Sequence, residues 1–336
     1  MNLSRGSHGP LLIAEIGGNH EGDFDTALRL ADLAIEAGAD AVKFQIYSGD
    51  TLVSVRESPE RNAHFKEFEL TPSRHLALAE RILAAGCAYI ASVWDLDAFA
   101  WIDPVVSAYK IGSGDLTAPP FLRAAATTGK PIILSTGLSD MAEVEAAVDY
   151  IRSFRPSYRD PSMLAVLQCT SMYPIAPSDA HLSVMQAFST FNVSVGYSDH
   201  TIGWRALEVA AAMGAQLLEF HFTDRKEGRA FRDHQLSLDS GDLRSLIRAL
   251  DEIGALKGKN AKTPLRIEIE NDHIDSFRRA VYPSRAIEIG EVLSEDNLCV
   301  LRPNHGIDAR EYYRLLGRRA RRRLLRHERL DWHDVE

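Results

Sequence analysis

The chain has few cysteines, fewer basic than acidic residues and no long apolar run, and each shortage excludes a class of protein. Three cysteines in 336 residues, widely spaced, predict neither a disulfide framework nor a thiolate zinc site. A net charge of -9 argues against a surface that binds nucleic acid. Residues 1–10 are polar and no apolar run approaches membrane-spanning length, so neither a signal peptide nor a membrane segment is expected. We therefore expect a cytoplasmic protein that acts on small molecules.

One pattern repeats from about residue 11 to residue 256. A short apolar run has a polar ending, and an amphipathic helix that often closes at glycine follows it. In the helix expected at 25–37, Asp23 or Asp25 can cap the start and Gly38 can end it. Other helices are expected at 73–85, 141–154 and 242–256. The expected strands are 11–17, 41–46, 88–93, 108–112, 131–135, 164–169, 193–197 and 217–222.

Eight strands that alternate with helices predict an α/β fold, a parallel (β/α)₈ (TIM) barrel. An open doubly wound sheet is the alternative. It is disfavoured because no G-x-G-x-x-G turn follows the first strand, and because polar residues end nearly every strand. We expect a barrel over 1–256, a linker over 257–277 and a small domain over 278–336. That domain has β-like runs at 280–282 and 298–301 and a basic helical tail at 318–329.

Two histidines follow neighbouring strands of the predicted barrel. His200 ends the run that begins at Gly196, and His221 ends the next strand. At the carboxyl ends of adjacent strands, two imidazoles can hold one divalent metal and leave most of its coordination positions open for catalysis. The alternative is a pair of histidines with ordinary hydrogen bonds.

Other polar side chains also follow the predicted strands. Lys43 and Lys110 point into one central space and should repel each other unless an anion lies between them. Ser113, Ser135 and Ser198 can complete an anion cradle. Singly, each residue has a simpler explanation, such as a solvated rim charge or a pairing of Glu15 with Lys43. Together they predict a site with a divalent metal on one side and a polyanionic substrate on the other.

Several motifs closely resemble the bacterial sialic acid synthases, and the resemblance covers nearly the whole chain. Two stretches near the C-terminus look like the antifreeze-like (SAF) domain that these synthases carry. The barrel motifs are AEIGGNH at 14–20, GADAVKFQ at 38–45, YKIGSGD at 109–115, GKPIILSTG at 129–137 and GYSDHTIG at 196–203, and the SAF-like stretches are AIEIGEVL at 286–293 and RPNHGI at 302–307.

The resemblance implies a transferase that condenses phosphoenolpyruvate with an open-chain, N-acylated mannosamine-type hexose. The products would be a nine-carbon 3-deoxy-2-ulosonic acid and phosphate. It implies manganese, with magnesium or cobalt as alternatives, held by His200 and His221. It also implies a domain-swapped homodimer in which Arg302 reaches the neighbouring subunit. By matching position, the resemblance implies that the catalytic carboxylates are Glu15 and Asp115 and that the sugar contacts are Tyr173, Asp233 and Arg302. The phosphoenolpyruvate contacts that it implies are Lys43, Gln45, Ser92, Lys110, Ser113, Ser135 and Ser198.

The sequence departs from the family pattern mainly at residues expected near the sugar. Phe220 replaces a basic residue between the glutamate and the histidine of the second metal strand, and it should face the helices because side chains alternate along a strand. Met172, Trp94 and the pair Phe231-Arg232 stand where other residues are common. The acceptor is therefore left open between N-acetylmannosamine and a variant such as a 2,4-diacetamido-trideoxyhexose.

Three other functions are consistent with parts of the sequence. A metal-dependent pyruvate aldolase would need the histidines but would have less use for the lysines and serines. The basic run 318–329 could bind nucleic acid or an anionic surface, although a solvated helix is the simpler interpretation. An inactive relative is disfavoured because both histidines, both lysines and Glu15 are present.

Overall fold

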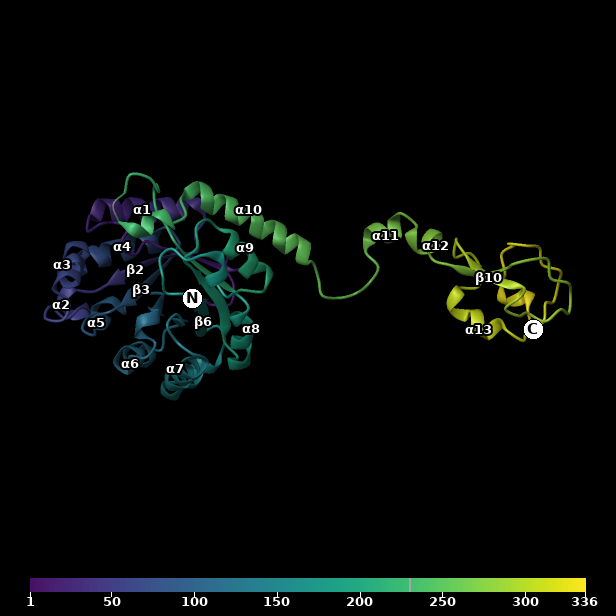
Figure 1. Ribbon diagram of the computed structural model, residues 1–336, viewed down its shortest axis with the longest axis horizontal. Helices are drawn as coiled ribbons and strands as arrows, with labels where there is room; N and C mark the ends of the chain where they lie inside the picture. Colours follow the sequence, from purple (N-terminus) through teal and green to yellow (C-terminus); the bar gives the residue numbers. More distant parts are fainter. Residues whose placement is uncertain (230) are drawn as a thin grey trace. The chain divides into compact units, whose positions relative to one another are not determined.

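The computed structural model describes residues 1–229 and 231–336, which form two compact units, Met1–Gly258 and Lys259–Glu336. In the first unit, eight parallel strands pair in chain order and close into a barrel surrounded by helices (Figure 1). Closure confirms the predicted (β/α)₈ barrel and excludes the open sheet. The strands are β1 Leu11–Glu15, β2 Ala41–Ile46, β3 Ala88–Val93, β4 Ala108–Ile111, β5 Ile132–Ser135, β6 Leu164–Cys169, β7 Ser194–Asp199 and β8 Leu217–His221.

Side chains along each strand alternate between the barrel interior and the layer of helices. In β1, Leu12 and Ala14 pack in the helix layer, whereas Leu11 and Ile13 pack in the interior. The next interior position of this strand is Glu15, at its carboxyl end. The same change from apolar to polar occurs in the other strands. The barrel interior is therefore an apolar core toward the amino ends of the strands and a polar site at their carboxyl ends. The apolar interior residues are Leu11, Ile13, Ala41, Ile90, Ala108, Ile133, Ala165, Leu167 and Leu217.

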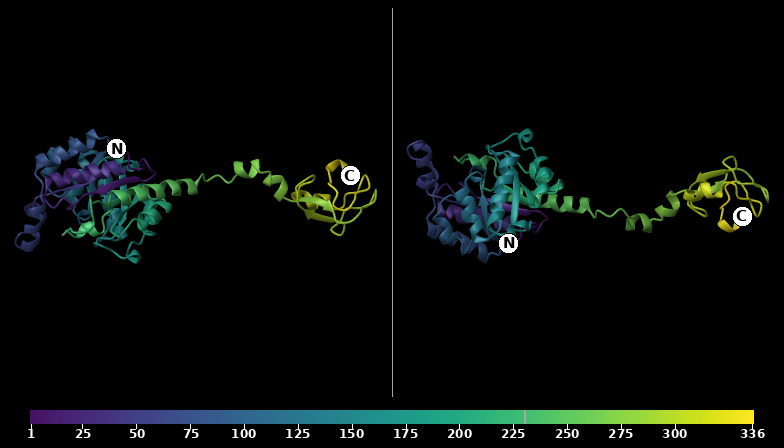
Figure 2. Two further views of the ribbon diagram at one scale, coloured as in Figure 1. Left: turned by 90° about the horizontal axis from the view of Figure 1, so that it is seen from above. Right: turned by 90° about the horizontal axis from the view of Figure 1, so that it is seen from below.

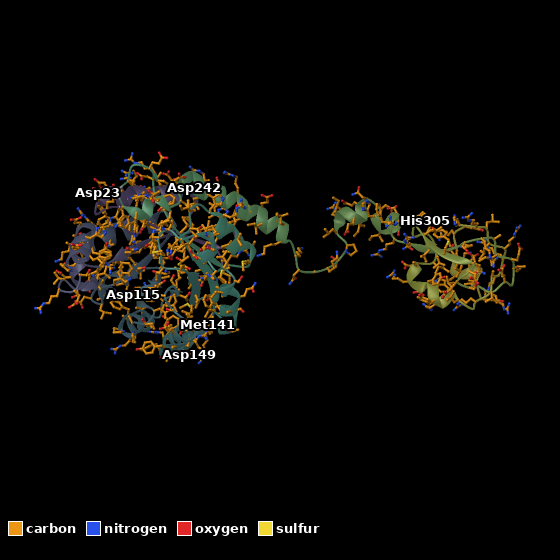
Figure 3. All side chains as sticks on the ribbon, viewed as in Figure 1. Asp23, Asp115, Met141, Asp149, Asp242 and His305 are labelled. Carbon is orange, nitrogen blue, oxygen red and sulfur yellow. The ribbon has the colours of Figure 1, made fainter. Side chains whose placement is uncertain are left out.

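Local capping sets the ends of the helices. Asp23 caps α1, since its carboxylate accepts a hydrogen bond from the Thr26 amide at 2.6 Å, and Gly38 ends it with a φ of 106°. Figure 3 labels Asp23, Met141 and Asp242, which lie near the starts of α1, α7 and α10. No helix that the structure describes is long and apolar enough to cross a membrane. The helices of this unit are α1 Phe24–Ala37, α2 Gly49–Leu52, α3 Pro59–Phe68, α4 Pro72–Ala84, α5 Ala98–Ile102, α6 Pro119–Thr128, α7 Met141–Phe154, α8 Val184–Phe188, α9 Arg205–Ala212 and α10 Ser240–Lys257.

The second unit corrects one expectation. The basic run 318–329 is not a helix, because its backbone pairs with other segments. Leu324 exchanges two 2.9 Å hydrogen bonds with Ile287, and Ala320 donates one to Glu291 at 3.0 Å. The expected linker 257–277 contains two short helices. The elements of this unit are α11 Arg266–Glu270, α12 His273–Phe277, the antiparallel pair β9 Ala280–Pro283 and β10 Leu298–Leu301, and α13 Tyr312–Leu315.

The N-terminal residues close the lower end of the barrel. Leu3 is fully buried and belongs to the apolar interior cluster with Leu11. Its amide donates a hydrogen bond to the Ser162 carbonyl at 3.2 Å. Asp40 fixes the segment that follows, since its carboxylate accepts from the Ser7 and Leu12 amides, each at 2.9 Å. Although residues 1–10 are mostly polar, the Leu3 side chain among them completes the apolar core.

We predict that Leu3→Ala destabilises the barrel by about 2–5 kcal/mol, because it leaves a cavity below the strands. Urea unfolding followed by tryptophan fluorescence measures this change. Met1→Ala is the matched control, because Met1 is 40% exposed and exposed substitutions usually change stability by less than about 0.5 kcal/mol. Equal stability of the two variants would contradict the role given to Leu3.

Candidate active site

A cavity of about 1320 Å³ opens at the carboxyl ends of the strands. All of the site residues predicted within the barrel line it. Arg302 lies in the second unit, where its guanidinium stacks on the ring of Phe277, 5.1 Å from the centroid. The predicted residues that line the cavity are Glu15, Lys43, Gln45, Ser92, Lys110, Ser113, Asp115, Ser135, Tyr173, Ser198, His200, His221 and Asp233.

Strand register determines which of these side chains meet. Glu15 is level with Lys43 on β2 and with His221 on β8, so one carboxylate lies between a lysine and a histidine. On the neighbouring strands, Ser92 is level with both Gln45 and Lys110. Because level residues of parallel strands point to the same face, the barrel places these groups side by side without help from loops.

The first buried ion pair joins Lys43 and Glu15. The Lys43 Nζ lies 2.7 Å from Glu15 Oε2 and donates to the Ser92 hydroxyl at 3.3 Å. The Gln45 amide donates to the other carboxylate oxygen at 2.6 Å. Burial opposes the charged form of Lys43, but the carboxylates of Glu15 and Glu219 outweigh burial and raise the pKa of this ammonium group. Lys43 is therefore charged at neutral pH.

The second buried ion pair joins Lys110 and Glu219, which is not among the residues predicted from the sequence. The Lys110 Nζ lies 3.2 Å from Glu219 Oε1, and the same oxygen accepts a 3.0 Å hydrogen bond from the Ser198 hydroxyl. Burial alone would raise the pKa of Glu219, but the ammonium groups of Lys110 and Lys43 lower it. The anionic charge expected beside the two lysines is supplied by the barrel itself, since each lysine has its own carboxylate.

Alternation along β8 is the signal that would have found Glu219. It lies two residues after the interior Leu217 and two before His221, so it must share their face. The same rule places Cys169 at the site, two residues after the interior Leu167 on β6. Phe220 has the opposite parity and packs in the helix layer, which confirms the prediction that it faces away from the cavity.

The two histidines lie together and are suited to hold a metal. The ring centroids of His200 and His221 are 5.5 Å apart. The His200 Nδ1 lies 2.7 Å from the Thr170 carbonyl and must donate to it, which leaves Nε2 with a free lone pair. Burial and the neighbouring His221 lower the pKa of His200 to about 3, so this ring is neutral at physiological pH.

The chemistry around His221 also fits a cation. Its buried Nδ1 lies 3.7 Å from the Asp233 carboxylate and has no hydrogen-bond partner among the described residues. Tyr173 covers both imidazoles, with its ring centroid 4.0 Å from that of His200 and 5.7 Å from that of His221. An unsatisfied ring nitrogen beside a carboxylate and a neutral imidazole is a donor set that a divalent metal would complete.

Hydroxyl and carboxyl groups surround the rest of the cavity floor. The buried Ser135 hydroxyl makes no hydrogen bond within residues 1–229 and 231–336, so it can donate to a ligand. The Ser113 hydroxyl oxygen accepts from the Gly137 amide at 3.0 Å, which holds the loop after β5 against the loop after β4. Asp115, labelled in Figure 3, lies in the loop after β4, and burial raises the pKa of its carboxyl group.

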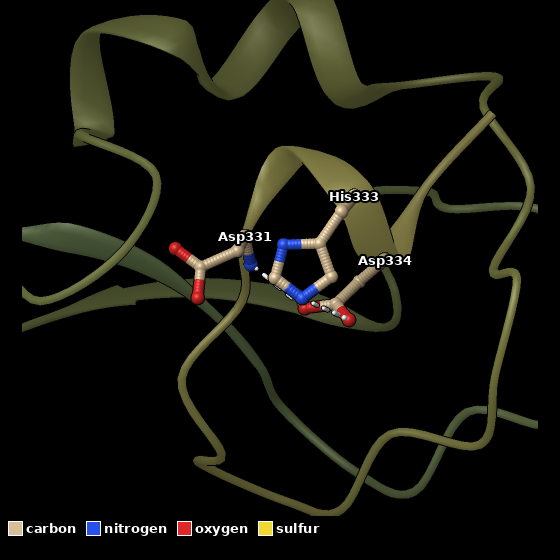
Figure 4. A group of neighbouring side chains, drawn as sticks. All are labelled: Asp331, His333 and Asp334. Atoms are coloured by element: carbon tan, nitrogen blue, oxygen red, sulfur yellow. Dashed lines mark hydrogen bonds and ion pairs between the residues drawn. The ribbon is translucent and has the colours of Figure 1, made fainter.

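A second cluster of metal-ligating side chains lies in the other unit and is already neutralised. Among the residues that the structure describes, Asp331, His333 and Asp334 are the one group of three such side chains whose ligand atoms gather within 4.8 Å (Figure 4). Arg322 Nε lies 2.6 Å from the Asp334 carboxylate, so an arginine occupies the position that a cation would take. We assign this cluster to folding of the small domain.

Known proteins resemble this chain over most of its length. The NeuB family model matches residues 30–262, and the SAF domain model matches residues 278–336. An uncharacterized protein of Methanocaldococcus jannaschii is 36% identical over 96% of this chain and 94% of its own. The N,N'-diacetyllegionaminic acid synthase of Legionella pneumophila is 32% identical over 97% of this chain and 94% of its own. The solved N-acetylneuraminic acid (sialic acid) synthetase of Leptospira borgpetersenii, in complex with citrate, matches with a TM-score of 0.72 and 31% identity, covering 79% of this chain and 91% of that one.

We predict that Lys110→Met destabilises the protein by about 3–5 kcal/mol, because it leaves the buried Glu219 carboxylate without its partner. The double variant with Glu219→Gln should recover most of this loss, and a double-mutant cycle in urea measures the coupling. Lys66→Met is the matched control, since it removes a 2.7 Å pair with Asp50 that is open to solvent and should contribute little. Additive effects of the two buried substitutions would contradict the pairing.

Proposed function

The chain belongs to the NeuB family, and on that basis we propose that it is a sialic-acid-type synthase. The proposed reaction joins phosphoenolpyruvate to the aldehyde of an open-chain, N-acylated amino sugar and yields a nine-carbon 3-deoxy-2-ulosonic acid and phosphate. One observation supports it above all: two buried ammonium groups and two close imidazoles line a single cavity. The reaction is proposed for the cytoplasm, where the three free cysteines stay reduced.

Phosphoenolpyruvate is proposed to bind at the two lysines. Its phosphate and carboxylate oxygens would accept hydrogen bonds from Lys43 and Lys110, which are both buried in a region of low dielectric. The free hydroxyl of Ser135 would add a further donor. Gln45, Ser92, Ser113 and Ser198 lie beside these groups and complete the proposed contact set.

His200 and His221 would hold the divalent metal, which we propose is manganese, with magnesium or cobalt as alternatives. The bound ion would act as a Lewis acid that polarises the sugar aldehyde. The chain's own part is to keep the His200 imidazole neutral and to fix its tautomer through the Thr170 carbonyl. Asp233, close to the Nδ1 of His221, and Tyr173, packed against His200, are positioned to orient the sugar.

Two carboxyl groups are available for the proton transfers of this reaction. As C3 of phosphoenolpyruvate attacks the aldehyde carbon, positive charge develops at C2 and the new alkoxide needs a proton. Water then adds to C2 with loss of a proton, and the C2–O bond to phosphate breaks as the keto group of the product forms. Glu15 and Asp115 line the cavity where both transfers would occur, and burial favours the protonated form of Asp115, which suits it to donate.

Arg302 is proposed to complete the sugar site from a second subunit. Its guanidinium already stacks on Phe277 within its own unit, which preorganises it for hydrogen bonds to the acyl or hydroxyl groups of an acceptor. A domain-swapped homodimer would bring it to the barrel of a partner.

We predict that mixing the protein with phosphoenolpyruvate, manganese and an N-acylated amino sugar releases inorganic phosphate. A metal-dependent pyruvate aldolase would release none, so this assay separates the two functions. His221→Ala should abolish turnover and weaken manganese binding, measured by electron paramagnetic resonance, because one imidazole ligand is lost. Phe220→Leu is the matched control on the same strand and should keep both properties. Undiminished turnover in metal-depleted buffer would contradict the proposed role of the histidines.

A further inference from the structure

A continuous row of six aromatic rings lines the cavity, contributed by α3 and by the loops after β2, β3 and β8. Neighbouring ring centroids are separated by 4.6 to 5.7 Å, the range of favourable aromatic packing. We call this row the aromatic wall. In order, its members are Trp94, Tyr47, Phe65, His64, Phe68 and Phe231.

Helix α3, which supplies three of the rings, is not built to fill the protein core. Its one fully buried residue is Asn62, whose amide donates to the carbonyls of Gly49 and Val53, each at 2.8 Å. Phe65 and Phe68 are half-buried and line the cavity. Figure 2 shows α2 and α3, drawn in dark blue, projecting from the ring of helices around the barrel. This helix is thus held in place by polar contacts, and its phenylalanines face the space where a ligand would lie.

The two ends of the aromatic wall are positions at which the sequence departs from the family resemblance. Trp94 forms one end, and Phe231 forms the other, 5.1 Å from Phe68. Gly18 leaves room for Phe231, because a Cβ at Gly18 would come within 2.8 Å of that ring. Phe231 is two residues from Asp233, so the loop after β8 carries both one end of the aromatic wall and the carboxylate that lies against His221.

The charged residues around the aromatic wall do not favour a second anion. The acidic side chains of the cavity opening outnumber the basic ones, and Arg232 is already paired with Asp233 at 3.2 Å. A phosphate group on the acceptor, with about two negative charges, would meet these carboxylates rather than a cluster of arginines. The charged residues in this part of the cavity are Glu21, Glu57, Glu67, Arg61 and Arg232.

We propose that the aromatic wall is the subsite for the end of the acceptor that is distant from the aldehyde. It selects a neutral sugar that carries apolar acyl or methyl groups at that end, in preference to a phosphorylated or fully hydroxylated one. This inference rests on the proposed function, because it takes the cavity to hold an open-chain amino sugar. Aromatic faces stabilise methyl groups by burying apolar surface, whereas hydroxyl groups placed there would lose hydrogen bonds to water.

The test compares three acceptors: 2,4-diacetamido-2,4,6-trideoxymannose, N-acetylmannosamine and N-acetylmannosamine 6-phosphate. Phosphate release should be most efficient with the first, and Phe231→Ala should lower its kcat/KM about tenfold or more, as expected for loss of a hydrophobic contact. The same variant should change kcat/KM for N-acetylmannosamine by less than about threefold. Tyr150→Ala, on α7 and outside the cavity, is the control and should affect neither.

A binding measurement separates this inference from the proposed function. In saturation-transfer NMR without phosphoenolpyruvate, the methyl and acetamido protons of the trideoxy sugar should receive the strongest saturation, and Phe231→Ala should reduce it. Such binding without phosphate release from any acceptor would overturn the proposed function and leave the subsite standing. Saturation concentrated at the aldehyde end, equal losses for all acceptors in Phe231→Ala, or a preference for the 6-phosphate would overturn the subsite.

Discussion

Two lysine–glutamate pairs buried at the top of a closed barrel are the constraint on which the site depends. Four charged groups lie above an apolar interior, and the loss of solvation is offset only because each ammonium group meets a carboxylate at 2.7 or 3.2 Å. The floor of the cavity therefore carries charged groups, but the opposite charges within each pair cancel. An anionic ligand therefore has to share the lysines with Glu15 and Glu219, which makes its binding an exchange of hydrogen bonds rather than the filling of a bare positive pocket.

The cavity has two chemically distinct linings. The strand ends contribute paired charges, hydroxyls and imidazoles, which suit an anion and a cation that react with each other. The loops after β2, β3 and β8 contribute aromatic rings, which suit an apolar part of a ligand. Because strands are fixed by the whole barrel while loops vary more freely, the reacting groups and the groups that select the substrate are carried by different parts of the fold.

Much of this arrangement follows from the sequence, since the eight strands, the motif resemblance and the polar strand ends were all evident in it. The matches to the NeuB and SAF models confirm that resemblance. Glu219 was missed because a glutamate within an apolar run was not assigned a face, although its parity with His221 fixes it. Leu3 was missed because a single apolar residue in a polar segment has no periodicity. The basic run 318–329 was wrongly predicted to be helical, because long-range backbone pairing, as between Leu324 and Ile287, leaves no local signal.

Calorimetric titration of phosphoenolpyruvate, without metal or sugar, is the decisive measurement of whether the buried lysines bind the anion. If the lysines bind the anion and the histidines bind the metal, Lys110→Met should weaken phosphoenolpyruvate binding by about tenfold or more, the loss expected for a charge-assisted hydrogen bond. His221→Ala should bind it as the unmodified protein does. Binding that survives Lys110→Met unchanged would mean that the buried lysines serve only the fold, and the proposed synthase site would be wrong.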